Sequence, residues 1–414
     1  TIPPVPPTVT AVTPIANAAN VALNNALISA AFSEPMAAIT GSASFTVSCA
    51  APCTSPSGSV SFDAANRVAI YTMASGISLS PSTTYTATVT VTGARSLATG
   101  LTLASPFVWQ FRTGLVTDTT RPRVVQTVPA TTYPGPTAGA PTNAAITAQF
   151  SEDMAPASVT AANVRLSCAA PCVAPAGAVS YVVGNRTAVL TPASTLAAGT
   201  TYTVTITIGA TDLAGNALAG NQAAPPAASA YVWTFVTAAA PAPSANVSVL
   251  STRPAANATG VCTNASINAT FSVPSGLRMD PSTINSGVFT VTGPAPGLVP
   301  VVAGSVVLDA ATGRIASFSP LVTLTAGVTY TVRIRGGNQG ARDLALPANV
   351  MANDYSWTFT PVNCTVPPLP AGVPLGAAAP FGTFGGSAGL TSQGLYTVIN
   401  GDIGTTAIST AVTG

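Results

Sequence analysis

The sequence contains no histidine and no lysine, and every one of its 13 basic residues is an arginine. Serine and cysteine nucleophiles usually need a histidine or a lysine as their base, so the common hydrolase mechanisms are excluded. Isopeptide cross-links between lysine and asparagine are excluded for the same reason. We therefore expect no enzymatic activity, no catalytic residues and no cofactor.

Charge is scarce as well. Only 6% of the residues are charged and the net charge is +2, against roughly 25% charged residues in an average soluble protein. Such a surface is poorly protected against self-association. Two explanations stand side by side, namely a compositional bias of the source genome and a protein that belongs in an assembly. The scattered arginines form no basic stripe, so we expect no nucleic-acid partner.

The sequence also lacks an apolar run long enough to cross a bilayer, although its mean hydropathy is +0.48. The apolar residues alternate with polar ones, as in strands. The chain starts with Thr1 and not with Met, which leads us to expect that a signal peptide or a tag was removed. Six cysteines, an even number, fit oxidised pairs in a secreted, extracellular or cell-surface protein.

Three aromatic stretches recur at a spacing of 124 residues, namely Phe107–Phe111, Tyr231–Phe235 and Tyr355–Phe359. They contain the three tryptophans of the chain, Trp109, Trp233 and Trp357. In each stretch every second residue is aromatic, the period of a strand with one buried face. We assign these tryptophans to the core and not to a ligand-binding cluster. A fixed repeat of this kind predicts a string of similar domains.

Further elements recur in the same order in each repeat. An edge strand ended by proline comes first, at Thr8–Pro14, Arg123–Pro129 and Val247–Pro254. An alternating strand ending in Phe-Ser follows, and later a tyrosine opens a Thr/Val strand. These tyrosines, which we also assign to the core, are Tyr85, Tyr202 and Tyr330. About seven short strands per repeat predict a Greek-key β-sandwich without long helices.

The expected fold is therefore all-β, with three tandem Ig-like Greek-key sandwiches. The predicted divisions are a Pro-rich leader at 1–7, sandwiches at 8–115, 121–238 and 247–363, and a Gly-rich segment at 373–414. The Pro/Ala-rich linker Ala238–Ser244 predicts a semi-rigid spacer. Three such domains in a row predict a rod.

The motifs of the repeats resemble the bacterial Ig-like domain of surface-layer type. The second repeat carries them most fully, in Phe150–Met154 (Phe-Ser-Glu-x-Met) and Asp212–Asn216 (Asp-Leu-Ala-Gly-Asn). The first repeat has Arg95–Ala98 in place of the Asp turn, and in the third Phe271–Ser275 lacks the acidic residue. The resemblance implies an extracellular spacer, stalk or wall-associated module without catalytic residues.

The last 40 residues, Leu375–Gly414, are Gly-rich and nearly uncharged, and they include the turn Asn400–Gly404 (Asn-Gly-Asp-Ile-Gly). This segment is similar to the opening of the bacterial ice-binding β-helix family. One or two coils of a parallel β-helix cannot bury a core. We therefore expect either that the polypeptide continues past Gly414 or that the segment serves another purpose here, such as assembly.

The cysteines form three predicted pairs. Cys49 with Cys53, and Cys168 with Cys172, are each separated by three residues. A redox or metal motif is one hypothesis, but no histidine is available as a ligand, and we favour a disulfide that closes a turn. Gly293–Gly297 stands at this place in the third repeat. Cys262 and Cys364 bracket the third repeat, and a bond between them would contribute about 4–5 kcal/mol. The alternative is an intermolecular bond.

The acidic residues suggest no metal site. Asp212, Gly215 and Asn216 could belong to a calcium loop, but the dense carboxylates of such loops are missing and a β-turn fits better. Glu152 and Asp153 are adjacent, so in a strand they point in opposite directions and share no site. Nothing in the sequence supports a glycosidase pair.

Our first functional hypothesis is a secreted structural protein that forms an extracellular fibre, sheath or stalk. Self-association into a homopolymer or surface assembly would use strand addition at exposed edges, with Thr1–Pro14 or Leu375–Gly414 as the donor. The alternative is an ice-binding adhesin with an Ig-like stalk and a β-helical head, whose partner is ice if the C-terminal domain is complete. Carbohydrate adhesion rests on fold analogy alone.

Overall fold

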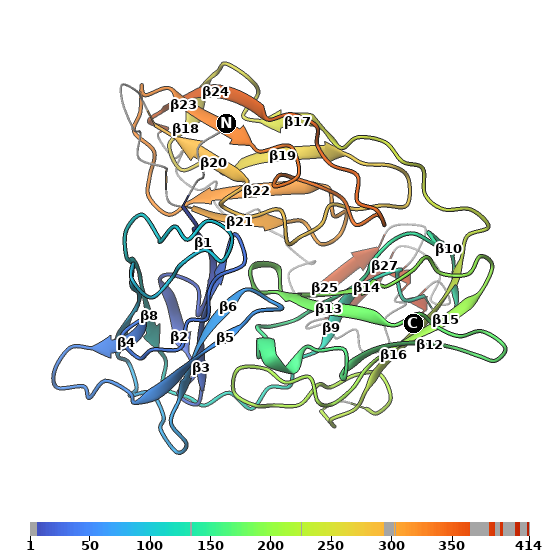
Figure 1. The fold of residues 1–414 in the computed structure, drawn as a ribbon, viewed down its shortest axis with the longest axis horizontal. Helices are drawn as coiled ribbons and strands as arrows, with labels where there is room; N and C mark the ends of the chain where they lie inside the picture. Colours follow the sequence, from blue (N-terminus) through green and yellow to red (C-terminus); the bar gives the residue numbers. More distant parts are fainter. Residues whose placement is uncertain are drawn as a thin grey trace.

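The computed structural model describes residues 6–132, 135–224, 226–293, 302 and 304–364, together with four short strands between 381 and 413. Three β-sandwiches make up almost all of this part, and they follow the colours of the chain in Figure 1 from blue through green to orange. The helices among the described residues are single 3₁₀ turns, η1 (Pro156–Ser158) and η2 (Val183–Asn185). No helix in this part is long and apolar enough to cross a membrane. The predicted all-β fold is confirmed.

Each sandwich contains eight strands, one more than we expected. Its two four-stranded sheets have the orders β1-β3-β6-β5 and β2-β8-β7-β4 in the first sandwich, with equivalent orders in the other two. The first has β1 (Val9–Thr13), β2 (Ala18–Val21), β3 (Leu27–Phe32), β4 (Phe45–Cys49), β5 (Gly58–Asp63), β6 (Val68–Met73), β7 (Thr84–Val89) and β8 (Phe107–Thr113).

The second sandwich has the sheets β9-β11-β14-β13 and β10-β16-β15-β12. Its strands are β9 (Val124–Val128), β10 (Thr137–Ala140), β11 (Ile146–Phe150), β12 (Val164–Cys168), β13 (Gly177–Val182), β14 (Thr187–Pro192), β15 (Thr201–Ile206) and β16 (Tyr231–Thr237).

The third sandwich has the sheets β17-β19-β22-β21 and β18-β24-β23-β20. Its strands are β17 (Ser248–Arg253), β18 (Ala258–Cys262), β19 (Ile267–Ser272), β20 (Phe289–Thr292), β21 (Gly304–Leu308), β22 (Ile315–Pro320), β23 (Tyr330–Ile334) and β24 (Tyr355–Val362).

The extra strand arises because the first segment of each repeat changes sheets. β1 pairs antiparallel with β3, and β2 pairs in parallel with the last strand, β8. Pro14 stands between β1 and β2; a proline has no N–H to donate, so the ladder ends there. β1 is paired with β3 of its own sandwich, so Val9–Thr13 would have to leave β3 in order to serve as a donor strand. The hypothesis that Thr1–Pro14 supplies a donor strand stays a prediction.

The Trp strand closes each sandwich and points its aromatic face inward. The tryptophans Trp109, Trp233 and Trp357 are only 3%, 3% and 4% exposed. Two residues after each tryptophan a phenylalanine stacks on the tyrosine opposite it in the neighbouring strand, as in the pair Tyr85–Phe111 with centroids 5.6 Å apart. The same stacks recur as Tyr202–Phe235 and Tyr330–Phe359. Each of these tyrosine hydroxyls accepts a backbone N–H, from Ser80, Ala197 and Thr325 respectively.

The three sandwiches lie at the corners of a triangle and not along a line (Figure 1). The first and third touch directly, because the hydroxyl of Ser286 donates to the carbonyl of Val9 at 3.4 Å. Our expectation of a rod is therefore wrong. The Ala238–Ser244 linker is fastened to the second sandwich, since Ala242 is hydrogen-bonded to Asn143. The rod expectation treated each repeat alone, whereas contacts between repeats set the shape.

Most of residues 365–414 lie outside the described residues, so the expected β-helix segment at 373–414 stays a prediction. The described strands there form two parallel pairs. β25 (Phe381–Gly385) pairs with β27 (Asp402–Thr405), and β26 (Leu390–Thr391) pairs with β28 (Val412–Thr413). The leader at 1–5 and the Gly293–Gly297 stretch beyond Gly293 are also outside the described part.

Candidate functional site: the joints between the sandwiches

The predicted disulfide pairs are all present in the structure. Cys49–Cys53 and Cys168–Cys172 each close the loop that leaves a strand end, with Cα atoms 5.8 Å apart. The bond between Cys262 and Cys364 joins the end of β18 to the second residue after β24, with Cα atoms 5.2 Å apart. All six cysteines are bonded within the chain, so no thiol is free for redox or metal chemistry.

The Asp-Leu-Ala-Gly-Asn motif forms a turn, as the sequence predicted, and its aspartate holds the turn together. The Asp212 carboxylate accepts the backbone N–H groups of Ala214 and Asn216 and the side-chain amide of Asn216 at 2.8–2.9 Å. Asp343 and Asn349 repeat this arrangement in the third sandwich. Gly215 has φ +89°, which suits glycine.

The same turn contacts the preceding sandwich, and this role was not predicted. The backbone N–H of Ala26, just before β3, donates to the carbonyl of Leu213 at 3.1 Å. The backbone N–H of Ala145, just before β11, donates to the carbonyl of Leu344 at 2.9 Å. The turn of one sandwich therefore docks on the start of a strand in the sandwich before it, and this contact occurs twice.

An asparagine clamp forms a second repeated contact. Asn66, in the turn between β5 and β6, accepts the backbone N–H of Tyr181 and donates to the carbonyl of Pro156. Asn185, in the turn between β13 and β14, accepts the backbone N–H of Leu308 at 3.1 Å and donates to the carbonyl of Pro281 at 3.4 Å.

The partners of the two clamps are equivalent residues. Pro156 and Pro281 each stand two residues after the repeat's methionine. Tyr181 and Leu308 occupy the same place in their hairpins, opposite Ala188 and Ala316. The same joint is thus built twice from the same positions.

The linkers are fixed by a third repeated contact. Asn24 and the backbone of Asp118 exchange two hydrogen bonds, at 2.9 and 2.7 Å. Asn143 and the backbone of Ala242 exchange two more, at 3.2 and 2.8 Å. Asp118 and Ala242 each lie five residues after the last residue of the closing strand. Each joint therefore has three parts, a docked turn, an amide clamp and a fastened linker.

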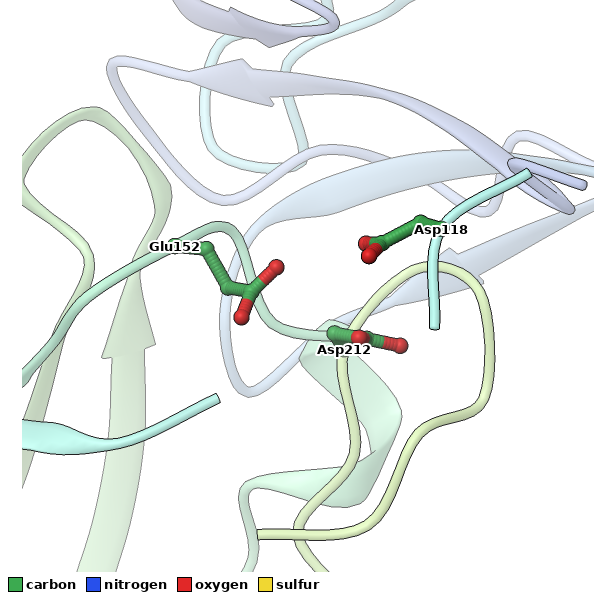
Figure 2. Close-up of side chains that lie close together, drawn as sticks. All are labelled: Asp118, Glu152 and Asp212. Atoms are coloured by element: carbon green, nitrogen blue, oxygen red, sulfur yellow. The ribbon is translucent and has the colours of Figure 1, made fainter. Parts of the chain in front are cut away.

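The first joint also gathers three carboxylates, which Figure 2 shows facing one another. Asp118 comes from the linker, Glu152 follows β11 and Asp212 comes from the turn. One oxygen of each lies within 4.8 Å of the others. Burial, and then the negative charges of Asp118, Asp212 and Asp153, raise the pKa of Glu152 to about 7. Burial also raises the pKa of Asp212, against the hydrogen bonds from Asn216.

This cluster can hold a proton at neutral pH, because a shared proton relieves the repulsion among close carboxylates. Hard cations such as Ca²⁺ also prefer oxygen ligands, but they need six to eight of them, so backbone or water oxygens would have to complete the set. Our expectation that the chain holds no metal stays a prediction, and these three residues are the place to test it.

The second joint replaces two of the three carboxylates. Ala242 stands where Asp118 stands, and Val273 stands where Glu152 stands, two residues after the phenylalanine. Val273 is buried in the third core. Only Asp343 remains acidic. The two joints therefore share the same hydrogen-bonded contacts and differ in charge. The neighbouring Asp153 forms an ion pair with Arg186 at 2.8 Å.

Three cavities of about 20, 40 and 60 Å³ lie between the sandwiches. Each has room for only a few water molecules. None of these three cavities is large enough for an organic substrate.

A comparison with protein families identifies the repeats. The Bacterial Ig-like domain matches residues 4–113, 118–237 and 244–361. The chain belongs to this family. The matched family is a structural module, which agrees with the absence of catalytic motifs in the sequence. No curated protein matches the chain.

Several solved structures match the chain at low similarity. The N-terminal part of the bacterial S-layer protein SbsC is 15% identical, with 54% of this chain and 43% of that chain covered and a TM-score of 0.22. Domains 1–6 of the same surface layer protein are 12% identical, with 87% and 55% covered and a TM-score of 0.21. The structure spanning domains MG0-NIE-MG1 of native alpha-2-macroglobulin from Escherichia coli is 11% identical, with 82% of this chain and 97% of that chain covered and a TM-score of 0.20. The chain thus spans about half of the S-layer structures it matches.

The contacts of the joint asparagines with other domains were not predicted, although the sequence carries one signal of them. Asn66-Arg67 and Asn185-Arg186 recur 119 residues apart, in the same turn of two repeats. Turns are rich in asparagine for local reasons, so this repeat alone does not reveal a contact with another domain.

Proposed function

We propose that this chain is a structural component of a bacterial cell surface, in which three Ig-like domains act as one rigid building block. The observation that carries the proposal is the joint built twice from equivalent residues. Flexible tandem domains are the default when interfaces are small and polar. Here each joint has a docked turn, an amide clamp and a fastened linker, which together resist bending.

An extracellular setting is supported by the cysteines. Three disulfides within one chain persist in oxidising compartments and are rare in the cytosol. The Cys262–Cys364 bond ties the two ends of the third domain together, so a pulling force across that domain loads a covalent bond. This suits a protein that carries load outside the cell.

Localisation tests the proposal directly. Antibodies against the three-domain region should label intact cells of the source organism in immunogold electron microscopy as strongly as permeabilised cells. Labelling that needs permeabilisation would contradict a surface role. Cell fractionation that finds most of the protein in the cytosol would contradict a surface role as well.

An ice-binding adhesin is the second candidate. The parallel pairing of Phe381 with Asp402, and of Leu390 with Val412, supports it, because these offsets of 21 and 22 residues suit one coil of a β-helix. Thermal hysteresis of the purified protein tests it. Measurable hysteresis that is lost on removal of 365–414 supports the candidate, and none at high protein concentration contradicts it.

A further inference from the structure

Among the described residues, one half of the joint has no partner domain at each end of the three domains. Isolated bridges pair Met36 with Ser96, Met154 with Asp212 and Met279 with Asp343. The residues after these partners, Leu97, Leu213 and Leu344, therefore occupy the same position in the three turns. In the second and third domains this leucine docks on the domain before it. The first domain has no such neighbour in the structure.

The exposed fraction of each leucine depends on whether a neighbouring domain covers it. Leu344 is 8% exposed and packs with Ala145 and Val189 of the second domain. Leu97 is 69% exposed. The first domain nevertheless keeps the turn itself, since the Ser96 hydroxyl accepts the backbone N–H of Thr99 and donates to Glu34.

The third domain carries the complementary half. The next turn docks beside the start of a strand, where Ala26 of the first domain and Ala145 of the second donate their backbone N–H groups. Leu27 and Ala145 are packed against the joint. Ser266 is the equivalent residue, because Ile28, Ile146 and Ile267 all stand four residues before the phenylalanine of their strand. Ser266 and Asn264 are exposed, so the backbone there is open to a partner.

We propose that the exposed Leu97 turn of one copy docks on Asn264–Ser266 of a second copy, repeating between chains the joint that occurs twice within the chain. The occupant is a second copy because it brings the matching half of an interface already built from this sequence. The inference rests on the proposed structural role and names the contact through which the block would assemble.

The expected contact is weaker than the joints within the chain. The third domain has Gly313 in the turn where the first two domains have the clamping Asn66 and Asn185, and it has a polar Ser266 in place of an apolar residue. No linker ties the two copies together. Reversible association is therefore expected.

The geometry also predicts an open assembly. A head-to-tail contact makes a ring when its rotation closes and a filament when it does not. The first and third domains of one chain already meet through Val9 and Ser286 and leave Leu97 exposed. The joint therefore does not close a ring of three within the chain, and we expect successive copies to extend.

Sedimentation velocity of the purified full chain over a range of concentrations tests the proposal. Leu97→Asp should weaken association at least about tenfold, since a tenfold change needs only 1.4 kcal/mol. Val173→Asp is the matched control, because Val173 is 88% exposed, receives the same charge and lies in no joint. Unchanged melting temperatures for both variants would show that folding is intact.

A gain-of-contact variant makes the test two-sided. Ser266→Leu restores the apolar residue of the first domain and should strengthen association, and adding Leu97→Asp should cancel that gain. The inference is overturned if the wild type stays monomeric throughout, or if Leu97→Asp and Val173→Asp associate as the wild type does. Either result concerns only the contact between copies. The structural role at the cell surface is tested separately by the labelling of intact cells.

Discussion

The side chain of Asn185 ties the second sandwich to the third by accepting the backbone N–H of Leu308 at 3.1 Å. Asn185 is buried, and its amide also reaches the carbonyl of Pro281. Asn66 makes the same two contacts between the first sandwich and the second. This repeated clamp explains why the block is a triangle and not a rod.

Replacing Asn185 with alanine should lower the free energy of unfolding by about 2 kcal/mol, because the buried N–H of Leu308 loses its acceptor. Chemical denaturation measures the change. Asn353→Ala is the control, since Asn353 is exposed and lies away from the clamps. Equal stability of the two variants would show that the clamp contributes nothing.

The leucines of the turns offer a matched pair. Leu344→Ala should cost about 2 kcal/mol, because it leaves a cavity between the second and third sandwiches. Leu97→Ala makes the same change at the equivalent position and should cost less than about 0.5 kcal/mol, because the side chain is exposed. Thermal or chemical unfolding compares them. Similar losses would mean that the joint does not bury Leu344 in solution.

The carboxylate cluster predicts a pH dependence of stability. The pKa of Glu152 is about 7 in the folded protein and 4.5 in the reference state. The folded state therefore binds this proton more tightly. Its stabilising effect is complete below about pH 4.5 and is lost as the pH rises through 7. Because the side chain is only half-buried, solvent screening limits the effect to about 1 kcal/mol.

Glu152→Gln isolates this effect from other titrations. At pH 8.5 the variant should be more stable than the wild type by about 1 kcal/mol, and at pH 5 the difference should vanish. The measurements need a chelator, so that no divalent cation replaces the proton. Glu34→Gln, at the equivalent position of the first sandwich, is the control. A pH-independent difference between wild type and Glu152→Gln would contradict the interpretation.

The long disulfide should matter more than the short ones. Cys262 and Cys364 are 102 residues apart in sequence, whereas Cys49 and Cys53 are 4 apart. By loop entropy, replacing the long pair with alanines should cost about 5 kcal/mol and replacing the short pair about 2 kcal/mol. Denaturation in the absence of reductant measures both. Disulfide-linked dimers on a non-reducing gel would show instead that Cys262 or Cys364 bonds between chains.

The interior of each sandwich could be predicted from the sequence because its signals are local and periodic. The alternation around Trp109 marks a buried strand face wherever the strand lies, and the tyrosine–phenylalanine stacks follow from the same strands. The Asp212 turn was predictable too, since its hydrogen bonds join residues at most four apart.

The joints could not be predicted because their contacts join residues about 100 apart, and the recurrence of Asn66 and Asn185 does not indicate their partners. Nothing in a turn containing Asn185 specifies that its amide meets Leu308, 123 residues later. The carboxylate cluster could not be predicted for the same reason, since Asp118, Glu152 and Asp212 come from three separate segments. Each looked like an ordinary polar residue in its own turn or linker.

Small-angle X-ray scattering of the monomeric protein tests the central claim, that the repeated joints hold the three Ig-like domains in one compact block. The account predicts a radius of gyration of about 22–25 Å, near that of a compact chain of this length. It also predicts that Asn66→Ala combined with Asn185→Ala raises this value. A radius of gyration above about 30 Å for the wild type, as expected for domains strung end to end, would contradict the account.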